Sequence, residues 1–371
     1  MPSILYISPA GTSGYAEAAK NYIIALSQYF KIQWQPLYYD DSLSNPTLKE
    51  LLIQQFIQTI SNPDVLIIHN TADRWEELKN KYDKPSIKKR IGITVWETDK
   101  LHPDWVKHCN QDWLDEIWVP VKWNKEVFEL SGVLKPIKVV PHIFYEPDFT
   151  PNGSLSQPVN YLIPNQLQNY FRFYTIGQWN ERKGITETIH AFCKAFTTND
   201  KVCLVVKTFW AKYSSEQQKI CQQKLNHILQ QYSNPPIIHL ITSHLSRNDI
   251  LLLHQSCHTY VSLCKSEGWG LGAFDATSLG NTVIITGYGG HTEFLPQNYT
   301  QYVNFTLQQV SGMPYIPWYS SSQNWAIPNE DDAIEKMRLS FRNNIRTKIS
   351  KLSNHVVVKF GINSIDWQKI V

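Results

Sequence analysis

The sequence of 371 residues lacks any run that approaches the ~18 uninterrupted apolar residues of a membrane-spanning helix. Its start lacks the basic segment and apolar run of a secretion signal, and is predicted to form a β-strand instead. Nothing in the sequence directs the chain out of the cytoplasm, so we expect a cytoplasmic protein. A chain of this length is too long for one ordinary core, which predicts two domains.

The 6 cysteines lack the C-x-x-C spacing of zinc and redox sites. We therefore expect reduced, mostly buried thiols and no metal site. The net charge of +3 is far below the basic excess of nucleic-acid-binding proteins, so no nucleic-acid partner is predicted. The basic stretch Lys79–Arg90 is interpreted as a solvated helix end and loop. A membrane-surface patch is the alternative, and no other feature supports membrane contact.

Short β-branched runs alternate with amphipathic stretches, which predicts parallel sheets covered on both faces by helices. The strands predicted in the first half are Ser3–Ser8, Ile32–Leu37, Val65–Ile68, Ile91–Trp96, Glu116–Val119 and Ile137–Val140. The helices predicted there are Ala16–Gln28, Leu48–Ile60 and Asn124–Leu130. The strands predicted in the second half are Phe173–Ile176, Val202–Val206, Ile237–Ile241, Tyr260–Leu263 and Val283–Thr286.

A stretch rich in Pro, Asn, Ser and Gly, Phe144–Gln168, interrupts the alternation and is predicted to be a linker. We therefore expect an α/β protein with two doubly wound, Rossmann-like domains facing a cleft, residues 1–165 and 166–350. Such sheets bind ligands beyond the carboxyl ends of their strands.

A glycine-rich loop, Glu267-Gly-Trp-Gly-Leu-Gly, separates a predicted strand from the predicted helix Leu271–Leu279. Free N–H groups and the positive dipole at a helix start form an anion site. A ligand with its diphosphate there could offer hydroxyls to Glu267 on one side and to Asp275 on the other. The alternative, which the spacing leaves open, is a tight strand-to-helix turn that the two acids merely cap.

The segment SEGWGLGAFDATSLGNTVIITGYGGHTEF resembles the donor-site signature of the family-4 retaining glycosyltransferases (glycosyltransferase group 1), which have the GT-B fold. The resemblance implies that Glu267 contacts the transferring sugar. It also implies that Asp275, where the family usually has Glu, binds the ribose hydroxyls of the donor. The backbone that would meet the diphosphate is that of Gly268, Gly270 and Leu271.

A second block, Phe173 to Gly184, resembles the family's first C-terminal strand and basic loop, where an Arg and a Lys neutralise the diphosphate. The resemblance implies that Lys183 does so here, as a catalytic and donor-binding residue. The family's Arg is replaced by Gln178. The missing charge could come from Arg182, beside Lys183, or from Lys207 at the end of a predicted strand.

The N-terminal half resembles the family more loosely. Its first predicted strand is followed by a loop like the family's glycine loop near the donor phosphate and the acceptor, which implies that Gly11 and Gly14 approach the donor. In family members the final helix returns to the first domain. Residues 351–371, which include Trp367, are therefore expected to pack on the N-terminal domain.

Two acids follow the predicted strand Ile91–Trp96, at the place of the family's polar residues near the reacting centre. Glu97 or Asp99 could orient the acceptor hydroxyl there. The alternative is that one of them forms the N-cap of a helix that begins at Pro103.

The resemblance implies a retaining transferase that moves a hexose from a UDP- or GDP-linked donor to a hydroxyl group of a glycan, lipid, protein or small molecule. The nucleotide sugar is a co-substrate, and no separate cofactor is expected. Basic side chains and helix N–H groups would do the work of a divalent metal. A non-catalytic protein that binds sugar nucleotides or glycans, and a sugar-nucleotide epimerase of the same fold, stay open as alternatives. The sequence defines neither the acceptor nor an oligomeric state.

Overall fold

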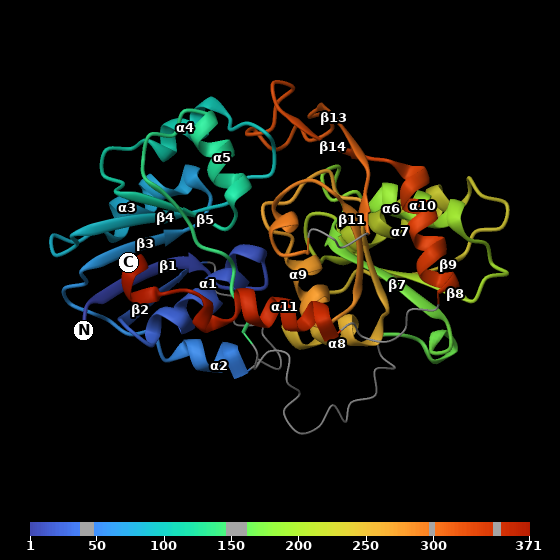
Figure 1. Ribbon diagram of the computed structural model, residues 1–371, viewed down its shortest axis with the longest axis horizontal. Helices are drawn as coiled ribbons and strands as arrows, with labels where there is room; N and C mark the ends of the chain where they lie inside the picture. The colour runs from blue at the N-terminus through green and yellow to red at the C-terminus, as the bar shows by residue number, and fades with distance from the viewer. Residues whose placement is uncertain (38–47, 146–161, 297–300, 344–349) are drawn as a thin grey trace. The chain divides into compact units, whose positions relative to one another are not determined.

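The computed structural model describes residues 1–37, 48–145, 162–296, 301–343 and 350–371. The chain divides into two compact units, each with its own six-stranded sheet (Figure 1). Unit 1 comprises Met1–Pro151 and Val356–Val371, and unit 2 comprises Asn152–His355. Among the described residues, no helix has the length and apolar character needed to cross a membrane. All 6 cysteines are buried, which confirms their expected burial.

The sheet of unit 1 has the order β2-β1-β3-β4-β5-β6, and all its neighbouring strands are parallel. The strands are β1 (Ser3–Pro9), β2 (Lys31–Leu37), β3 (Val65–His69), β4 (Lys89–Ile93), β5 (Glu116–Val119) and β6 (Ile137–Val139). The helices are α1 (Gly14–Ser27), α2 (Leu48–Gln54), α3 (Trp75–Tyr82), α4 (Pro103–Cys109) and α5 (Lys122–Leu130). The strand order reverses at β1, which places a topological switch point between the carboxyl ends of β1 and β3.

The core of unit 1 follows from apolar strands that are buried on both faces. Six consecutive residues of β1, from Ser3 to Ser8, are buried, as expected for a central parallel strand. Gly92 in β4 is required by packing, because a Cβ there would lie 2.7 Å from the indole of Trp75. Ser13 caps α1 by accepting a hydrogen bond from the Ala16 N–H at 3.2 Å.

The last residues of the chain also belong to unit 1. The Phe144 N–H donates to the Phe360 carbonyl at 2.7 Å, and Lys138 Nζ donates to the Ile370 carbonyl at 2.8 Å. Trp367 is only 1% exposed and packs in the core, where its ring centroid lies 5.7 Å from that of Tyr22. Residues from both ends of the sequence therefore complete one core.

The sheet of unit 2 has the order β12-β11-β10-β7-β8-β9, and again all its neighbouring strands are parallel. The strands are β7 (Phe171–Gln178), β8 (Val202–Phe209), β9 (Ile237–Ile241), β10 (Thr259–Ser262), β11 (Thr282–Thr286) and β12 (Tyr302–Val303). An antiparallel hairpin, β13 (Phe305–Gln309) and β14 (Asn324–Pro328), lies outside this sheet. The strand order reverses between β7 and β10, so the switch point of unit 2 lies between their carboxyl ends.

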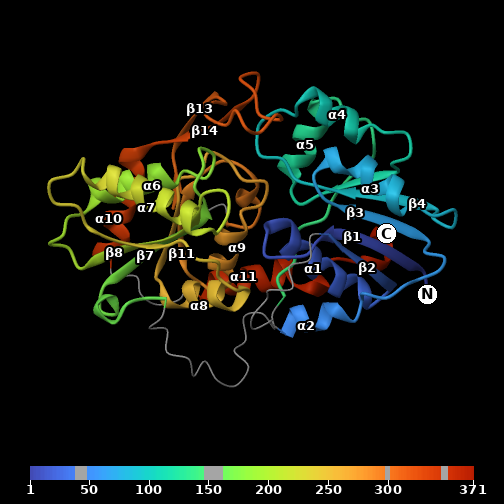
Figure 2. The ribbon, with the colours of Figure 1, turned by 180° about the vertical axis from the view of Figure 1, so that it is seen from behind.

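Helices cover both faces of this second sheet. The helices are α6 (Ile185–Ala195), α7 (Ser215–Leu229), α8 (Arg247–Ser256), α9 (Leu271–Ser278) and α10 (Glu330–Arg342). Two views show α6, α7 and α10 together on one face, and α8 and α9 on the other (Figure 1, Figure 2). The short helices α11 (Ser350–Phe360) and α12 (Trp367–Ile370) follow α10 in the chain. Two doubly wound, Rossmann-like units are thus confirmed.

Most predicted elements are present, and the exceptions have physical reasons. Helix α2 ends at Gln54 and not at Ile60, because the chain turns away to bind the edge of β2: the Phe56 carbonyl accepts a hydrogen bond from the Trp34 N–H at 2.7 Å. Strand β4 ends at Ile93 and not at Trp96, because the Asn124 amide of α5 binds the Trp96 carbonyl at 2.8 Å.

Only the two ends of the predicted linker Phe144–Gln168 can be described, because residues 146–161 lie outside the described ranges. At its C-terminal end the chain is ordered against unit 2. Leu162 and Ile163 are buried, and Asn165–Leu167 forms a 3₁₀ helix.

The substitution Trp367→Ala is expected to destabilise unit 1 by about 3–5 kcal/mol, because it removes a fully buried indole from the core. Urea denaturation followed by fluorescence and circular dichroism measures the change. Tyr315→Ala is the control, because Tyr315 is 56% exposed. An unfolding curve for the Trp367 variant that coincides with the control curve would contradict the packing described here.

Candidate active site

The switch point of unit 2 is formed by two loops in close contact. The loop after β7 ends at Gly184, and the loop after β10 begins at Leu263. Gly184 has φ +63°, and a Cβ there would lie only 2.0 Å from the Leu263 carbonyl oxygen. The Lys265 N–H donates to the Arg182 carbonyl at 2.7 Å. Because no side chain larger than hydrogen fits at residue 184, the two loops are held against each other.

Three charged side chains meet where these loops cross. Lys183 Nζ donates to Glu267 Oε1 at 2.5 Å, and Arg182 Nη1 donates to Glu267 Oε2 at 3.0 Å. Arg182 also donates to the Ser266 carbonyl at 2.9 Å. The structure thus brings together three of the candidate catalytic residues, and it places them at the edge of the sheet where ligands bind in such folds.

Glu267 is only 9% exposed. Burial alone would raise its pKa, but the charges of Lys183 and then Arg182 outweigh this effect and lower the pKa to about 2. Glu267 is therefore ionised at neutral pH. Two cations around one anion leave this group with a net positive charge, which is suited to an anionic ligand.

The start of α9 lies directly beyond Glu267. Gly270 precedes the helix with φ +87°, a conformation that favours glycine, and both Gly270 and Leu271 are partly exposed. Gly272 is required by packing, because a Cβ there would lie 2.7 Å from the Tyr260 hydroxyl. Gly270 thus serves the strand-to-helix turn, which was the alternative explanation, and Gly272 allows α9 to pack on β10. The contact of Gly268, Gly270 and Leu271 with a diphosphate stays a prediction.

Asp275 lies in α9 and is 2% exposed. Arg247, the first residue of α8, donates to both of its oxygens, at 2.5 Å to Oδ2 and 3.0 Å to Oδ1. A ribose hydroxyl would have to share the carboxylate with Arg247, and the ribose contact stays a prediction. Arg247 was not among the residues predicted from the sequence. The signal was Ser246-x-x-Asp249, which forms the capping box of α8.

Gln178, which replaces the family's Arg, has a structural partner. Its Nε2 donates to the Trp210 carbonyl at 2.7 Å, and this bond ties the end of β7 to the loop after β8. Of the two cations considered as its replacement, Arg182 lies at Glu267 and Lys207 does not. Lys207 is buried near the end of β8, beside Tyr213.

The candidate residues of unit 1 lie beyond the carboxyl ends of its strands. Gly11 follows β1, and Gly14 begins α1. A Cβ at either position would meet nothing within 4 Å, so packing requires neither glycine. The Tyr15 hydroxyl lies 2.9 Å from Thr94 Oγ1, which joins the start of α1 to the segment that leads to Glu97.

Glu97 and Asp99 are partly exposed in the segment after β4. The proposed alternative, that one of them caps α4, is wrong. The N-cap of α4 is His102, whose Nδ1 accepts a hydrogen bond from the Asp104 N–H at 3.2 Å. His102 directly precedes Pro103, so its imidazole reaches the first free N–H group of the helix.

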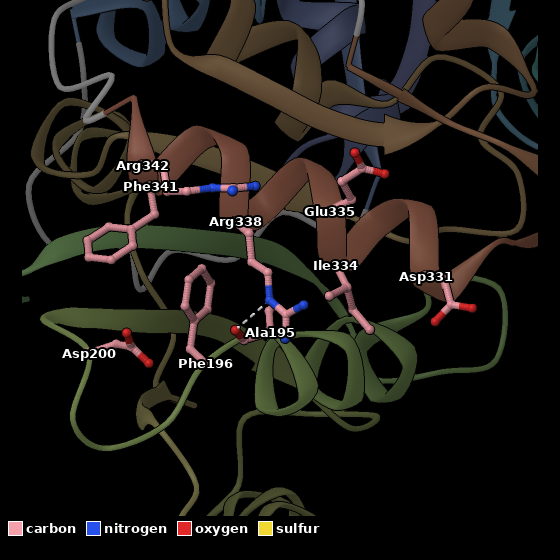
Figure 3. Close-up of a pocket in the computed structure, with 9 residues that line it drawn as sticks. All are labelled: Ala195, Phe196, Asp200, Asp331, Ile334, Glu335, Arg338, Phe341 and Arg342. Atoms are coloured by element: carbon pink, nitrogen blue, oxygen red, sulfur yellow. Dashed lines mark hydrogen bonds between the residues drawn. The ribbon is translucent and has the colours of Figure 1, made fainter.

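A surface pocket of about 530 Å³ occurs elsewhere in unit 2 (Figure 3). Arg338 of α10 crosses it and donates to the Ala195 carbonyl at 3.0 Å. Asp200, another lining residue, precedes β8, so this pocket lies toward the amino ends of the strands. It is therefore not part of the site around Glu267. Among the described residues, no group of three or more His, Cys, Asp or Glu side chains could hold a metal ion.

These two parallel sheets, with their order and their reversals, define the GT-B fold, which known structures share over the whole chain. The structure of Anabaena HepE (Alr3699) in complex with UDP-glucose has a TM-score of 0.68 at 14% identity, and the match covers 99% of this chain and 98% of that one. A glycosyltransferase from Rickettsia africae has a TM-score of 0.65 at 16% identity, with 99% and 96% covered. An E. coli structure described as trehalose-6-phosphate bound with UDP-2-fluoro glucose has a TM-score of 0.65 at 12% identity, with 99% and 97% covered.

Residues 164–306 match the family model of the glycosyl transferases group 1. The matched segment holds Arg182, Lys183, Glu267 and Asp275, and the match confirms the resemblance to the group 1 glycosyltransferases seen in the sequence. The narrower assignment to family 4 stays a prediction. No curated protein matches the chain in sequence.

The substitution Asp275→Asn is expected to lower the free energy of unfolding by about 3–5 kcal/mol, because it leaves the charge of Arg247 buried without its counter-ion. The double variant Asp275→Leu/Arg247→Met should recover much of this loss. Asp331→Asn is the control, because Asp331 is exposed. Chemical denaturation measures the free energy of unfolding of all three variants. If Asp275→Asn were as stable as the control, the ion pair of Arg247 and Asp275 would have to be solvated.

Proposed function

We propose that this protein is a retaining glycosyltransferase that transfers a hexose from a UDP- or GDP-linked donor to a hydroxyl group of a second substrate. The observation that carries the proposal is the group formed by Glu267, Arg182 and Lys183. It lies at the switch point of a GT-B unit, within the segment that matches the group 1 glycosyltransferases. The complexes of similar folds with UDP-glucose and UDP-2-fluoro glucose support a nucleotide-sugar donor.

The charge of this group suits the departure of a nucleoside diphosphate. As the bond to the sugar breaks, negative charge develops on the leaving oxygen. Lys183 and Arg182 would transfer part of their interaction from Glu267 to the diphosphate, and the N–H groups at the start of α9 would bind its oxygens. Positioned cations of this kind are the basis for expecting turnover without a divalent metal.

The role proposed for Glu267 is to bind the transferring sugar. Its carboxylate, ionised by Lys183 and Arg182, would accept hydrogen bonds from sugar hydroxyls and stabilise the positive charge of an oxocarbenium-like transition state. The acceptor hydroxyl would attack from the face that the diphosphate leaves. Its proton would pass to the departing phosphate, so a separate general base is not required.

The acceptor side is assigned to unit 1 in this proposal. Gly11 and Gly14, which leave open space at the carboxyl end of β1, would approach the donor phosphate beside the acceptor. Glu97 or Asp99 would orient the acceptor hydroxyl. The cytoplasmic location also stays a prediction.

A panel of UDP- and GDP-linked hexoses, each with and without EDTA, tests the proposal. Mass spectrometry of the products, and NMR of the anomeric centre, should show release of the nucleoside diphosphate and transfer of the sugar with retained configuration, unaffected by EDTA. Binding without release would indicate a non-catalytic sugar-nucleotide-binding protein, and an altered but intact donor would indicate an epimerase. Loss of activity in EDTA that magnesium or manganese restores would contradict the metal-free mechanism.

The substitution Lys183→Ala is expected to lower kcat/KM by an amount equivalent to about 2–4 kcal/mol, because the leaving diphosphate loses a charge-assisted partner. Steady-state kinetics over a range of donor concentrations measure the change. Lys194→Ala is the matched control, because Lys194 is half-exposed and pairs with Glu330 at the surface. Wild-type kcat/KM in a correctly folded Lys183 variant would remove this residue from the site.

A further inference from the structure

Lys207 is a buried lysine without an acceptor atom among the residues that the structure describes. Its residue is 3% exposed, near the carboxyl end of β8. Its Nζ lies 4.8 Å from the ring centroid of Tyr213 and 6.0 Å from that of Phe209. Within the part of the chain that the structure describes, no oxygen accepts a hydrogen bond from this ammonium, and no carboxylate pairs with it.

This arrangement is unfavourable for the protein alone. Burial lowers the pKa of Lys207 to about 8. Aromatic rings attract a cation, but they do not satisfy its three N–H donors as water does. A side chain retained only for packing at this position would be better apolar, so the ammonium is suited to an acceptor atom of a ligand.

Lys207 does not share the position of Lys183. Ile176 of β7 pairs in register with Lys207 of β8, so these two side chains point to the same face of the sheet. The neighbouring residue, Gly177, points to the opposite face, where a Cβ would contact the Lys183 side chain at 3.6 Å. The Lys207 side chain therefore leaves its strand on the face of α8 and α9, opposite to Lys183, and its ammonium lies beside Tyr213.

Along the carboxyl ends of the strands, Lys207 lies where the base of a nucleotide would lie if its diphosphate were bound at α9. Adjacent strands are ~4.8 Å apart, so β8, two strands from β10, lies about 10 Å from the loop that holds Glu267. The opposite direction, toward β11, is closed. Gly290 packs so tightly on the loop that a Cβ there would lie 2.0 Å from the Gly268 carbonyl oxygen. A nucleoside whose diphosphate is bound at α9 would thus extend toward β8.

The loops after β8 and β9 hold the Tyr213 ring beside Lys207. The Gln178 side chain fixes the loop after β8 through its hydrogen bond to the Trp210 carbonyl at 2.7 Å. The Tyr213 ring contacts the ring of His244, from the loop after β9, with the centroids 5.0 Å apart. This group combines flat apolar surfaces with one strong hydrogen-bond donor, which matches the chemistry of a nucleobase.

We propose that Lys207 determines the base specificity of the donor site: its ammonium donates a hydrogen bond to a carbonyl oxygen of the base, and the Phe209 and Tyr213 rings contact the base. This inference rests on the proposed function, because it requires a nucleotide donor. Uracil and guanine carry a carbonyl oxygen that accepts such a bond, whereas adenine carries none. The site should therefore select UDP or GDP against ADP.

Calorimetry with UDP, GDP, ADP and inorganic pyrophosphate tests this inference on the full-length protein. The wild-type protein should bind UDP or GDP about tenfold or more tighter than ADP. Lys207→Met should lose most of that preference, while its affinity for pyrophosphate stays unchanged. Tyr213→Leu, a second variant at a partly exposed position, should weaken the same nucleotide and leave pyrophosphate binding unchanged. The control is Lys224→Met, because Lys224 lies 4.5 Å from the ring centroid of Trp210 in a similar contact.

The outcomes separate the two proposals. Equal loss of nucleotide and pyrophosphate affinity in Lys207→Met would place Lys207 at the diphosphate and overturn the inference. Unchanged preference for UDP or GDP would remove Lys207 from the site, with the proposed function intact. A wild-type protein that binds none of the four ligands would overturn both. Because methionine retains the packing of the lysine side chain, and the ammonium has no acceptor among the described residues, the melting temperature of the variant should equal or exceed that of the wild type. A marked decrease would reveal a partner within the protein and overturn the inference.

Discussion

The contact between the loops that follow β7 and β10 is the constraint on which the candidate site depends. Gly184 can carry no side chain, because the Leu263 carbonyl oxygen occupies that space. The residues next to it in the chain, Arg182 and Lys183, are therefore held across from Glu267. Two loops that are far apart in sequence thus form one charged group, in which ion pairs join Arg182 and Lys183 to Glu267.

The charges of unit 2 differ in how completely they are balanced. Arg247 and Asp275 form a buried pair of opposite charges, each side chain almost fully enclosed. At Glu267 two cations surround one anion, and Lys183 remains 25% exposed. A balanced pair stabilises the position of one helix against another, whereas an excess of positive charge at an accessible edge attracts anions. This difference indicates a structural role for Arg247 and agrees with the donor-binding role proposed for Lys183.

Much of the fold could be predicted from the sequence, because buried parallel strands are continuous apolar runs that alternate with helices. The group around Glu267 could be predicted as well, since its residues lie in two motifs with characteristic order. Arg247 could not be assigned to Asp275, because the two are brought together only by the packing of α8 on α9. The hairpin β13–β14 was missed for a similar reason: its core consists of Val310, Met313 and Trp325, which show no simple period in the sequence.

The division of the chain into units has a consequence for biosynthesis. Unit 2 is continuous in sequence, whereas unit 1 takes its final core residues from the segment after Val356. During translation, unit 2 can fold as soon as it leaves the ribosome, because domains fold as units in the order of synthesis. Unit 1 cannot complete its core until Trp367, which lies after unit 2 in the chain, has also left the ribosome. Until then its core is open around Tyr22, and the nascent chain is most exposed to chaperones and proteases at the half that was made first.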